Sequence, residues 1–154
     1  MRKLTVIQLV APAVLFFIYS TILNAAPRTA CDLLDAKMAA SLAGGQVDAP
    51  MDTGFLCVYA DESAKTQVMF SLTDASTQDA ESYIQAHGGA KQGDIYESIP
   101  SLPSKNLFVV TSYQKHSLTV FVRGKEVNLI VHRHMTPELK ATMVEVMKRI
   151  LARL

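Results

Sequence analysis

Hydrophobic residues along this chain follow two different spacings once the first 26 residues are passed. A spacing of three to four residues, typical of one buried helix face, predicts helices over residues 30–43, 77–87 and 137–154. Alternation of apolar and polar residues predicts strands over residues 54–60, 66–72, 95–98, 107–113, 116–123 and 125–134. The order α-β-β-α-(β)-β-β-β-α favours an α+β fold, an antiparallel sheet with helices packed on one face. The other face of such a sheet can stay open to solvent.

Residues that start and stop helices stand at the ends of the predicted helices. Thr29, Ser76 and Thr136 occupy N-cap positions, where a side-chain oxygen accepts a hydrogen bond from a free backbone N–H. Gly44 and Gly88 follow the first two helices, and glycine is the common residue just past a helix end. These signals fix the helix boundaries independently of the hydrophobic spacing.

The last two strands carry the sharpest local prediction, a hairpin around Arg123-Gly124-Lys125-Glu126. With glycine first in a two-residue loop, a type II′ turn is expected. The resulting register pairs Val122 with Val127, Val120 with Leu129 and Leu118 with Val131, and it points these residues toward the core. Arg123 then faces Glu126 across the strands, while the opposite face carries Phe121, Ile130 and His132.

The first 26 residues have the layout of a secretory signal peptide. Arg2 and Lys3 precede an apolar run over residues 9–19, and Ala25 and Ala26 offer small residues for cleavage. We therefore expect residues 27–154 to form a single domain in the periplasm or outside the cell. The alternative is an uncleaved anchor, in which case the protein would contact the membrane through this segment.

Export gives meaning to the two cysteines, Cys31 and Cys57, because an oxidising compartment favours a disulfide between a lone pair. Closing a loop of about 27 residues is expected to stabilise the fold by about 3 kcal/mol in the chain-entropy model. A reactive thiol or a redox pair is the alternative, but the chain has no C-x-x-C motif.

Part of the N-terminal half resembles a family of small secreted bacterial domains of unknown function, often described as lipoproteins in actinobacteria. The resemblance rests on Cys31-Asp32-Leu33-Leu34, on a helix that ends Leu42-Ala43-Gly44-Gly45, and on Cys57-Val58-Tyr59. It implies an α+β domain with one disulfide and carries over no catalytic residue. The chain departs from the lipoprotein pattern because Arg28 stands where a lipidation motif needs an apolar residue.

His132 and His134 are the one pair of residues with metal-ligand spacing. Two histidines at i and i+2 of a strand point the same way and could share a Zn²⁺ or Cu²⁺ ion, with His116, Asn128 or Met135 as a further ligand. The alternative is two exposed histidines at a strand end. No cofactor is predicted. The chain lacks the G-x-S-x-G, H-E-x-x-H, P-loop and G-x-G-x-x-G motifs, so no enzymatic activity is predicted.

Charge is divided unevenly along the chain. Residues 27–99 hold 4 basic and 11 acidic residues, whereas residues 100–154 hold 9 basic and 3 acidic residues. In one interpretation the halves interleave and their charges meet as surface pairs. In the other, the late hairpin forms a basic face that attracts an acidic partner. That face would comprise Phe121, Arg123, Lys125, Ile130, His132, Arg133 and His134.

Composition limits the possible functions. Hydrophobic residues make up 49% of the chain, charged residues 19%, and the net charge is +1. These values are typical of a globular domain and disfavour a disordered chain or a basic nucleic-acid binder. The leading hypothesis is a non-enzymatic exported domain that binds a protein or envelope partner, as an immunity or inhibitor protein does. A small-molecule or metal carrier using His132 and His134 is the alternative, and a hydrolase ranks below both.

The export hypothesis makes a direct prediction. Mass spectrometry of the protein purified from its native host should find a mature N-terminus between Ala25 and Arg28, because the small residues of the cleavage region lie there. An intact Met1 in the membrane fraction would instead identify an anchored protein.

Overall fold

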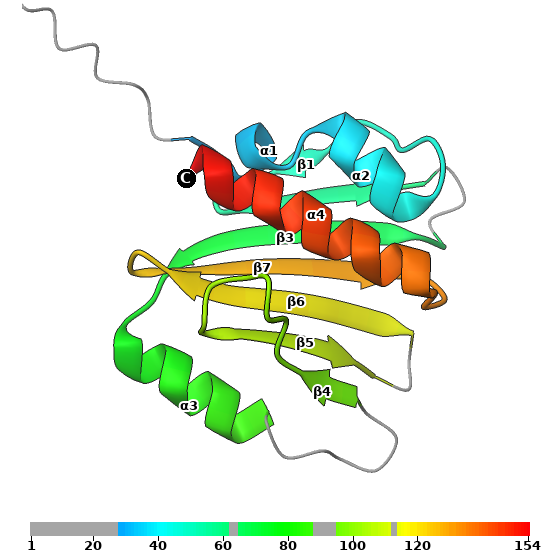
Figure 1. Ribbon diagram of the computed structural model, residues 1–154. Helices are drawn as coiled ribbons and strands as arrows, with labels where there is room; N and C mark the ends of the chain where they lie inside the picture. The colour runs from blue at the N-terminus through cyan, green and yellow to red at the C-terminus, as the bar shows by residue number, and fades with distance from the viewer. Residues whose placement is uncertain (1–27, 62–64, 88–94, 112–113) are drawn as a thin grey trace, which may run out of the picture.

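The structure is a computed structural model, and it describes residues 28–61, 65–87, 95–111 and 114–154 (Figure 1). The predicted signal peptide lies outside these ranges, as does Gly88. Within them the chain forms four helices and seven strands: α1 (Ala30–Leu33), α2 (Ala36–Ala43), β1 (Met51–Asp52), β2 (Leu56–Ala60), β3 (Gln67–Asp74), α3 (Thr77–His87), β4 (Ile95–Glu97), β5 (Asn106–Val110), β6 (Lys115–Val122), β7 (Lys125–His132) and α4 (Pro137–Arg153).

All seven strands join one antiparallel sheet in the order β1-β2-β3-β7-β6-β5-β4. The predicted α+β class is confirmed. The two-residue strand β1 was not predicted, and the expected helix over residues 30–43 is two helices. The chain breaks at Leu34, which is extended, and Asp35 then caps α2 by accepting a hydrogen bond from Met38 N at 2.9 Å.

The other helix starts match the capping signals. Thr29 forms a capping box with Asp32, and Ser76 forms reciprocal hydrogen bonds with Asp79 at the start of α3. Thr136 accepts a hydrogen bond from Leu139 N at the start of α4. Side-chain oxygens therefore satisfy backbone donors that the helices leave free.

One face of the sheet, the inner face, is covered by α1, α2 and α4 (Figure 1). Alternate residues of the central strands point into this layer and are fully buried. They pack against the apolar stripe of α4, which contains Met143, Met147 and Ile150. The inward strand residues are Cys57, Tyr59, Val68, Phe70, Leu118, Val120, Val127, Leu129 and Val131.

The third helix departs from the predicted arrangement, because α3 packs on the opposite face. Tyr83 of α3 contacts Phe121, with ring centroids 5.5 Å apart, and its hydroxyl lies 3.1 Å from Thr119 Oγ1. Thr119 and Phe121 alternate with the inward-pointing Leu118 and Val120 along β6, so they lie on the other side of the sheet. Phe121 is consequently buried, with 8% of its surface exposed.

The late hairpin is present, but its predicted register is wrong by two residues. Val122 pairs with Lys125 and Val120 with Val127, so the two-residue loop is Arg123-Gly124 and not Gly124-Lys125. Both loop residues have positive φ angles, 52° and 73°, as in a type I′ turn. The expected Arg123–Glu126 pair does not form in this register, because Glu126 lies opposite Phe121.

The error leaves the predicted faces intact. Side chains alternate with a period of two, so a two-residue shift returns each one to the same side of the sheet. Val120, Val127, Leu129 and Val131 are buried as predicted, Val122 is half-buried, and Ile130 and His132 lie on the opposite face.

A disulfide and a hydrogen bond join the segment that contains α1 to strand β2. The predicted disulfide between Cys31 and Cys57 is confirmed, with Cα atoms 5.0 Å apart. Two residues along β2, the buried Tyr59 hydroxyl donates to Leu34 O at 3.1 Å. From the end of α4, Arg153 donates to Leu33 O and pairs with Asp35. The segment formed by residues 33–35 is therefore bonded both to β2 and to the C-terminal end of α4.

The charge division of the sequence is partly neutralised within the fold. Among the described residues five ion pairs form, and four of them join an acid of the first half to a base of the second. This arrangement matches the interpretation in which the two halves interleave. The four pairs are Lys105–Glu81, Lys125–Asp74, Lys140–Glu97 and Arg153–Asp35.

The disulfide should contribute substantially to stability. Replacing both cysteines, Cys31→Ala with Cys57→Ala, should lower the free energy of unfolding by about 2–5 kcal/mol, the usual loss for a small exported domain. Urea unfolding of the oxidised protein and the double variant measures this difference. Tyr59→Phe is the matched control, because it removes only the nearby hydrogen bond and should cost about 0.5–1.5 kcal/mol. An unchanged midpoint in the double variant would contradict the assignment.

Candidate functional site

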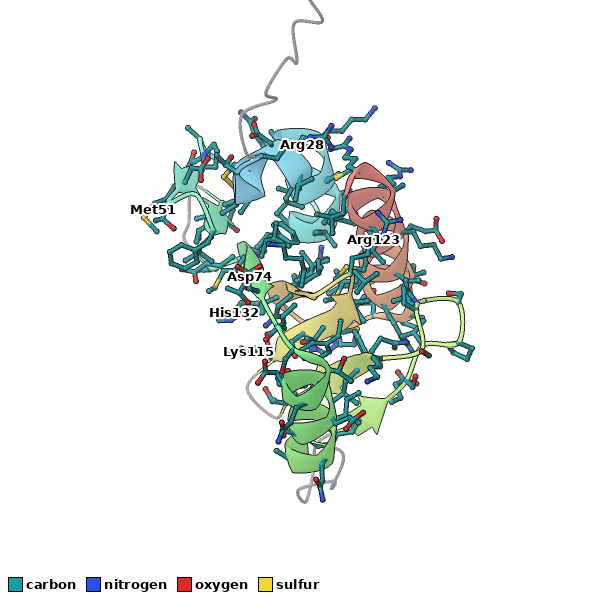
Figure 2. All side chains as sticks on the ribbon, turned by 90° about the vertical axis from the view of Figure 1, so that its left-hand side faces the viewer. Arg28, Met51, Asp74, Lys115, Arg123 and His132 are labelled. Carbon is teal, nitrogen blue, oxygen red and sulfur yellow. A yellow bond between two sulfur atoms is a disulfide. The ribbon has the colours of Figure 1, made fainter. Side chains whose placement is uncertain are left out.

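The side of the sheet away from α1, α2 and α4 is only partly covered. In Figure 2 Met51, His132 and Lys115 lie on this side, away from α4. The helix α3 packs over Thr119 and Phe121 of β6, toward the β4 end of the sheet. We call the remaining part, formed by the outward residues of β1, β2, β3 and β7 with the adjoining end of β6, the open face.

A row of apolar side chains crosses the open face. Met51 pairs with Val58, Val58 with Met69, and Met69 with Ile130, so the four side chains stand side by side on neighbouring strands. Met51 is 59% exposed and the other three are half-buried. Four strands at a spacing of about 4.8 Å make this apolar row about 14 Å long.

Polar residues flank the apolar row on both sides. On one side Gln67, His132 and Lys115 are paired across β3, β7 and β6, and on the other Ser71 and Asn128 are paired across β3 and β7. Two atoms in these rows, Asn128 Oδ1 and His132 Nε2, are buried and have no hydrogen-bond partner. A buried polar atom without a partner costs about 1–3 kcal/mol, so the fold leaves two unsatisfied polar atoms directly beside the apolar row.

His132 is the titratable residue of the open face that lies nearest the apolar row. Partial burial lowers the pKa of its imidazole, and the positive charge of Lys115 lowers it further. Lys115 is exposed and takes part in none of the ion pairs of the described residues, unlike Lys105, Lys125, Lys140 and Lys148.

His116 lies on the inner face and is 1% exposed. Its Nε2 is 2.7 Å from Arg133 O, so this nitrogen carries the proton and donates it, while Nδ1 is buried without a partner. Burial is the largest cause that lowers the pKa of His116, and the charges of His132 and His134 act in the same direction. The imidazole is therefore a neutral structural group.

The structure does not assemble the predicted metal site. Strand β7 ends at His132, so the alternation that would place His134 beside it does not continue, and His134 is exposed beyond the strand. His116 points to the opposite face. In the described part of the chain, no group of three or more His, Cys, Asp or Glu side chains is placed to hold a metal ion.

Arg133 is engaged inside the fold. Its Nη1 donates to Leu42 O at 3.0 Å, at the C-terminal end of α2, where a positive charge is favourable. The guanidinium lies so close to Gly44 that a Cβ atom there would stand 2.4 Å from Nη1. Gly44 has a φ of 79°, which also favours glycine, so the helix end and the arginine fit together only with this residue.

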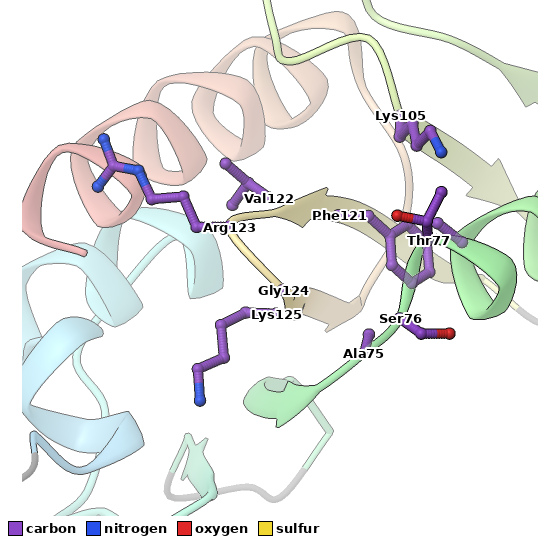
Figure 3. Close-up of a pocket in the computed structure, with 10 residues that line it drawn as sticks. Ala75, Ser76, Thr77, Lys105, Phe121, Val122, Arg123, Gly124 and Lys125 are labelled. Carbon is purple, nitrogen blue, oxygen red and sulfur yellow. The ribbon is translucent and has the colours of Figure 1, made fainter.

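The other end of β7, around the hairpin loop, holds three more residues of the predicted basic face: Phe121, Arg123 and Lys125 (Figure 3). Phe121 lines a small cavity of about 160 Å³ there, together with Ala80 and Lys105. Figure 3 shows Arg123 and Lys125 pointing away from Phe121, and Lys125 pairs with Asp74. Seven residues of strand, about 23 Å, separate this end from His132. The predicted face is therefore split into two separate groups.

Sequence reasoning placed Ile130 and His132 on a partner surface but missed Met51, Val58 and Met69. The signal was present in the alternation of the first hairpin, because Val58 and Met69 occupy outward positions that usually carry polar residues. Their position beside Ile130 depends on the pairing of β3 with β7, which no local pattern shows.

A second hollow runs between the edge strand β4 and helix α4. It consists of two adjoining cavities of about 350 and 440 Å³ that share Glu97, Pro137 and Lys140. The walls are mainly apolar and include Ile95, which is 56% exposed, and Phe108. The ion pair between Lys140 and Glu97 lies between the two cavities.

Comparisons with protein-family models, with curated proteins and with solved structures find no match to this chain. The resemblance of residues 31–59 to small secreted domains stays a prediction. Within the described ranges, none of the helices is long and apolar enough to cross a membrane.

The buried imidazole of His116 predicts how stability depends on pH. In the unfolded chain a histidine binds a proton near pH 6.5, whereas folded His116 binds it only at lower pH. As pH falls below about 6.5 the unfolded state binds more protons, so the free energy of unfolding should decrease between pH 7.5 and 5.5.

His116→Gln keeps a donor for Arg133 O but does not titrate, so the decrease should be smaller in this variant. Urea unfolding at the two pH values measures it, with His134→Gln, at an exposed histidine, as the control. Equal decreases in His116→Gln and the unaltered protein would show that His116 does not cause the effect.

Proposed function

We propose that this protein is an exported, non-enzymatic domain that binds a protein or envelope partner through the open face, in the manner of an immunity or inhibitor protein. The observation that carries the proposal is the apolar row of Met51, Val58, Met69 and Ile130, which no helix of the described structure covers. Contiguous apolar side chains rimmed by polar residues are typical of interaction surfaces.

The layer behind the row supports this use. Phe70 and Leu129 occupy the inward positions next to Met69 and Ile130, and both are fully buried against the helical layer. The strands that carry the row are therefore held from behind by a closely packed core, which leaves little freedom to collapse over the exposed side chains. A preformed surface loses less conformational entropy on binding than a flexible one.

Export is supported by two independent features. Arg2 and Lys3 with the apolar run after them have the layout of a secretory signal, and the Cys31–Cys57 disulfide suits an oxidising compartment. A partner in the cell envelope or outside the cell follows from that location.

The hollow between β4 and α4 favours a second candidate, carriage of a small apolar molecule. Its walls combine exposed Ile95 with Phe108 and a nearby ion pair. This candidate would use a surface of the molecule distinct from the open face, so the two can be separated by substitution.

Substitution in the apolar row tests the proposed function. Met69→Asp and Ile130→Asp place a charge at the centre of the row, and each should weaken the binding of a partner captured from envelope extract and then purified. We expect a loss of at least about tenfold in affinity, or 1.4 kcal/mol, measured by isothermal titration. Circular dichroism should show an unchanged fold, because both side chains point outward.

Ala141→Asp provides the matched control. Ala141 is exposed on α4 and lines the second hollow, so its substitution adds the same charge away from the open face. Undiminished binding by Met69→Asp and Ile130→Asp would contradict the proposal. Loss of binding only in Ala141→Asp would favour the hollow instead.

A further inference from the structure

We infer that the partner is acidic beside its apolar contact and that Lys115 and His132 receive its carboxylate. This inference rests on the proposed function and specifies the chemistry of the partner at the same face. Lys115 and His132 are directly paired across β6 and β7, and His132 lies two residues from Ile130 on the same side of the sheet.

The first reason is that Lys115 forms no ion pair with an acid of the described residues. Lys105, Lys125 and Lys140 each pair with a carboxylate from the first half of the chain, which is where most of the acidic residues are. Lys115 has no such pair within the part of the chain that the structure describes, although it is exposed at the edge of the apolar row. A cation in this position attracts an anionic group and disfavours a cationic one, so it selects an acidic partner.

The second reason is the environment of His132. The residue that faces it from β3 is the neutral Gln67, and the residue that faces it from β6 is Lys115. On β7 itself Arg133 and His134 follow, and Arg133 is turned to Leu42. None of these groups is an acid, and the buried Nε2 of His132 has no hydrogen-bond partner among the described residues. A carboxylate from a partner would approach the exposed part of this half-buried imidazole and stabilise its protonated form.

Binding of a carboxylate should therefore be linked to proton uptake. Burial and Lys115 keep His132 neutral near pH 7, and a bound carboxylate would favour its charged form and raise its pKa. Because the protonated form binds the carboxylate better, the affinity should increase as pH falls from 7.5 to 5.5.

Two matched synthetic peptides test this inference on the purified protein. One alternates apolar residues with Asp, and the other replaces each Asp with Asn. Nuclear magnetic resonance titrations should show the acidic peptide shifting the resonances of Met69, Ile130, Lys115 and His132. We expect it to bind about tenfold more tightly than the Asn peptide at pH 5.5, with a smaller difference at pH 7.5 and a raised pKa for His132.

Lys115→Gln and His132→Gln should each remove most of the preference for the acidic peptide. Lys37→Gln is the matched control, because Lys37 is an exposed lysine on α2 that, like Lys115, takes part in none of the ion pairs of the described residues. Equal binding of the two peptides, failure of the acidic peptide to bind, or shifts confined to another surface would overturn the inference. Binding to phosphatidylglycerol vesicles with the same dependence on Lys115 and His132 would also overturn it and assign the surface to a membrane.

The inference and the proposed function can fail separately. If the purified partner loses affinity for Met69→Asp but binds Lys115→Gln and His132→Gln normally, the open face is the binding surface and the acidic partner is wrong. If Met69→Asp binds the partner normally, the proposed function itself is wrong.

Discussion

The pairing of β3 with β7 is the interaction on which the rest of the structure depends. These strands come from opposite halves of the chain, and their ladder runs over eight residues, from Gln67 opposite His132 to Asp74 opposite Lys125. It joins the first meander, β1 to β3, to the second, β4 to β7, in one sheet. The same pairing places Asp74 opposite Lys125, one of the four described ion pairs that join the acidic half of the chain to the basic half.

The ladder also determines what each face of the sheet does. Val68, Phe70, Leu129 and Val131 meet on its inner side, and the helices α1, α2 and α4 bury them completely. The outer side brings Met69 beside Ile130, and α3 reaches only the β6 side of this face. The burial that stabilises the fold therefore comes mainly from one side, whereas the apolar row on the other side stays exposed or half-buried. An apolar row that the described helices leave uncovered is well suited to a partner.

Much of the fold could be predicted from the sequence because its signals are local. Caps at Thr29, Ser76 and Thr136 depend on residues within one helical turn, and the alternation in the late hairpin identified the inward side chains. The disulfide between Cys31 and Cys57 was predicted because the chain has two cysteines and a predicted signal peptide. The hairpin register was two residues wrong because Arg123-Gly124 and Gly124-Lys125 are both acceptable loops, and both keep Val120 and Val127 inward.

The candidate site was less predictable because it depends on contacts between distant segments. Nothing near Arg133 in sequence indicates that its side chain caps α2 through Leu42, 91 residues away. Likewise, Lys125 looks like a free surface cation until β3 places Asp74 opposite it. Of the seven residues predicted to form a basic face, only Ile130 and His132 lie together on the open face, since β7 separates the loop residues from the strand end. A run of charges in sequence therefore overstated the basic surface that the fold presents.

The edges of the sheet support the proposal that a partner binds the open face and not a sheet edge. An exposed edge strand offers unpaired backbone groups to which another chain can add as a further strand. Here the edge strands are short, with two residues in β1 and three in β4, so either edge offers few backbone groups for such pairing. The apolar row instead runs across the strands and presents side chains to a partner. Side-chain recognition across strands is more selective than backbone pairing, because shape and charge both contribute to it. Lys115 and His132 at the border of the row add a charge component, so the short edges and this charge both support the proposal that a partner binds the open face through side chains.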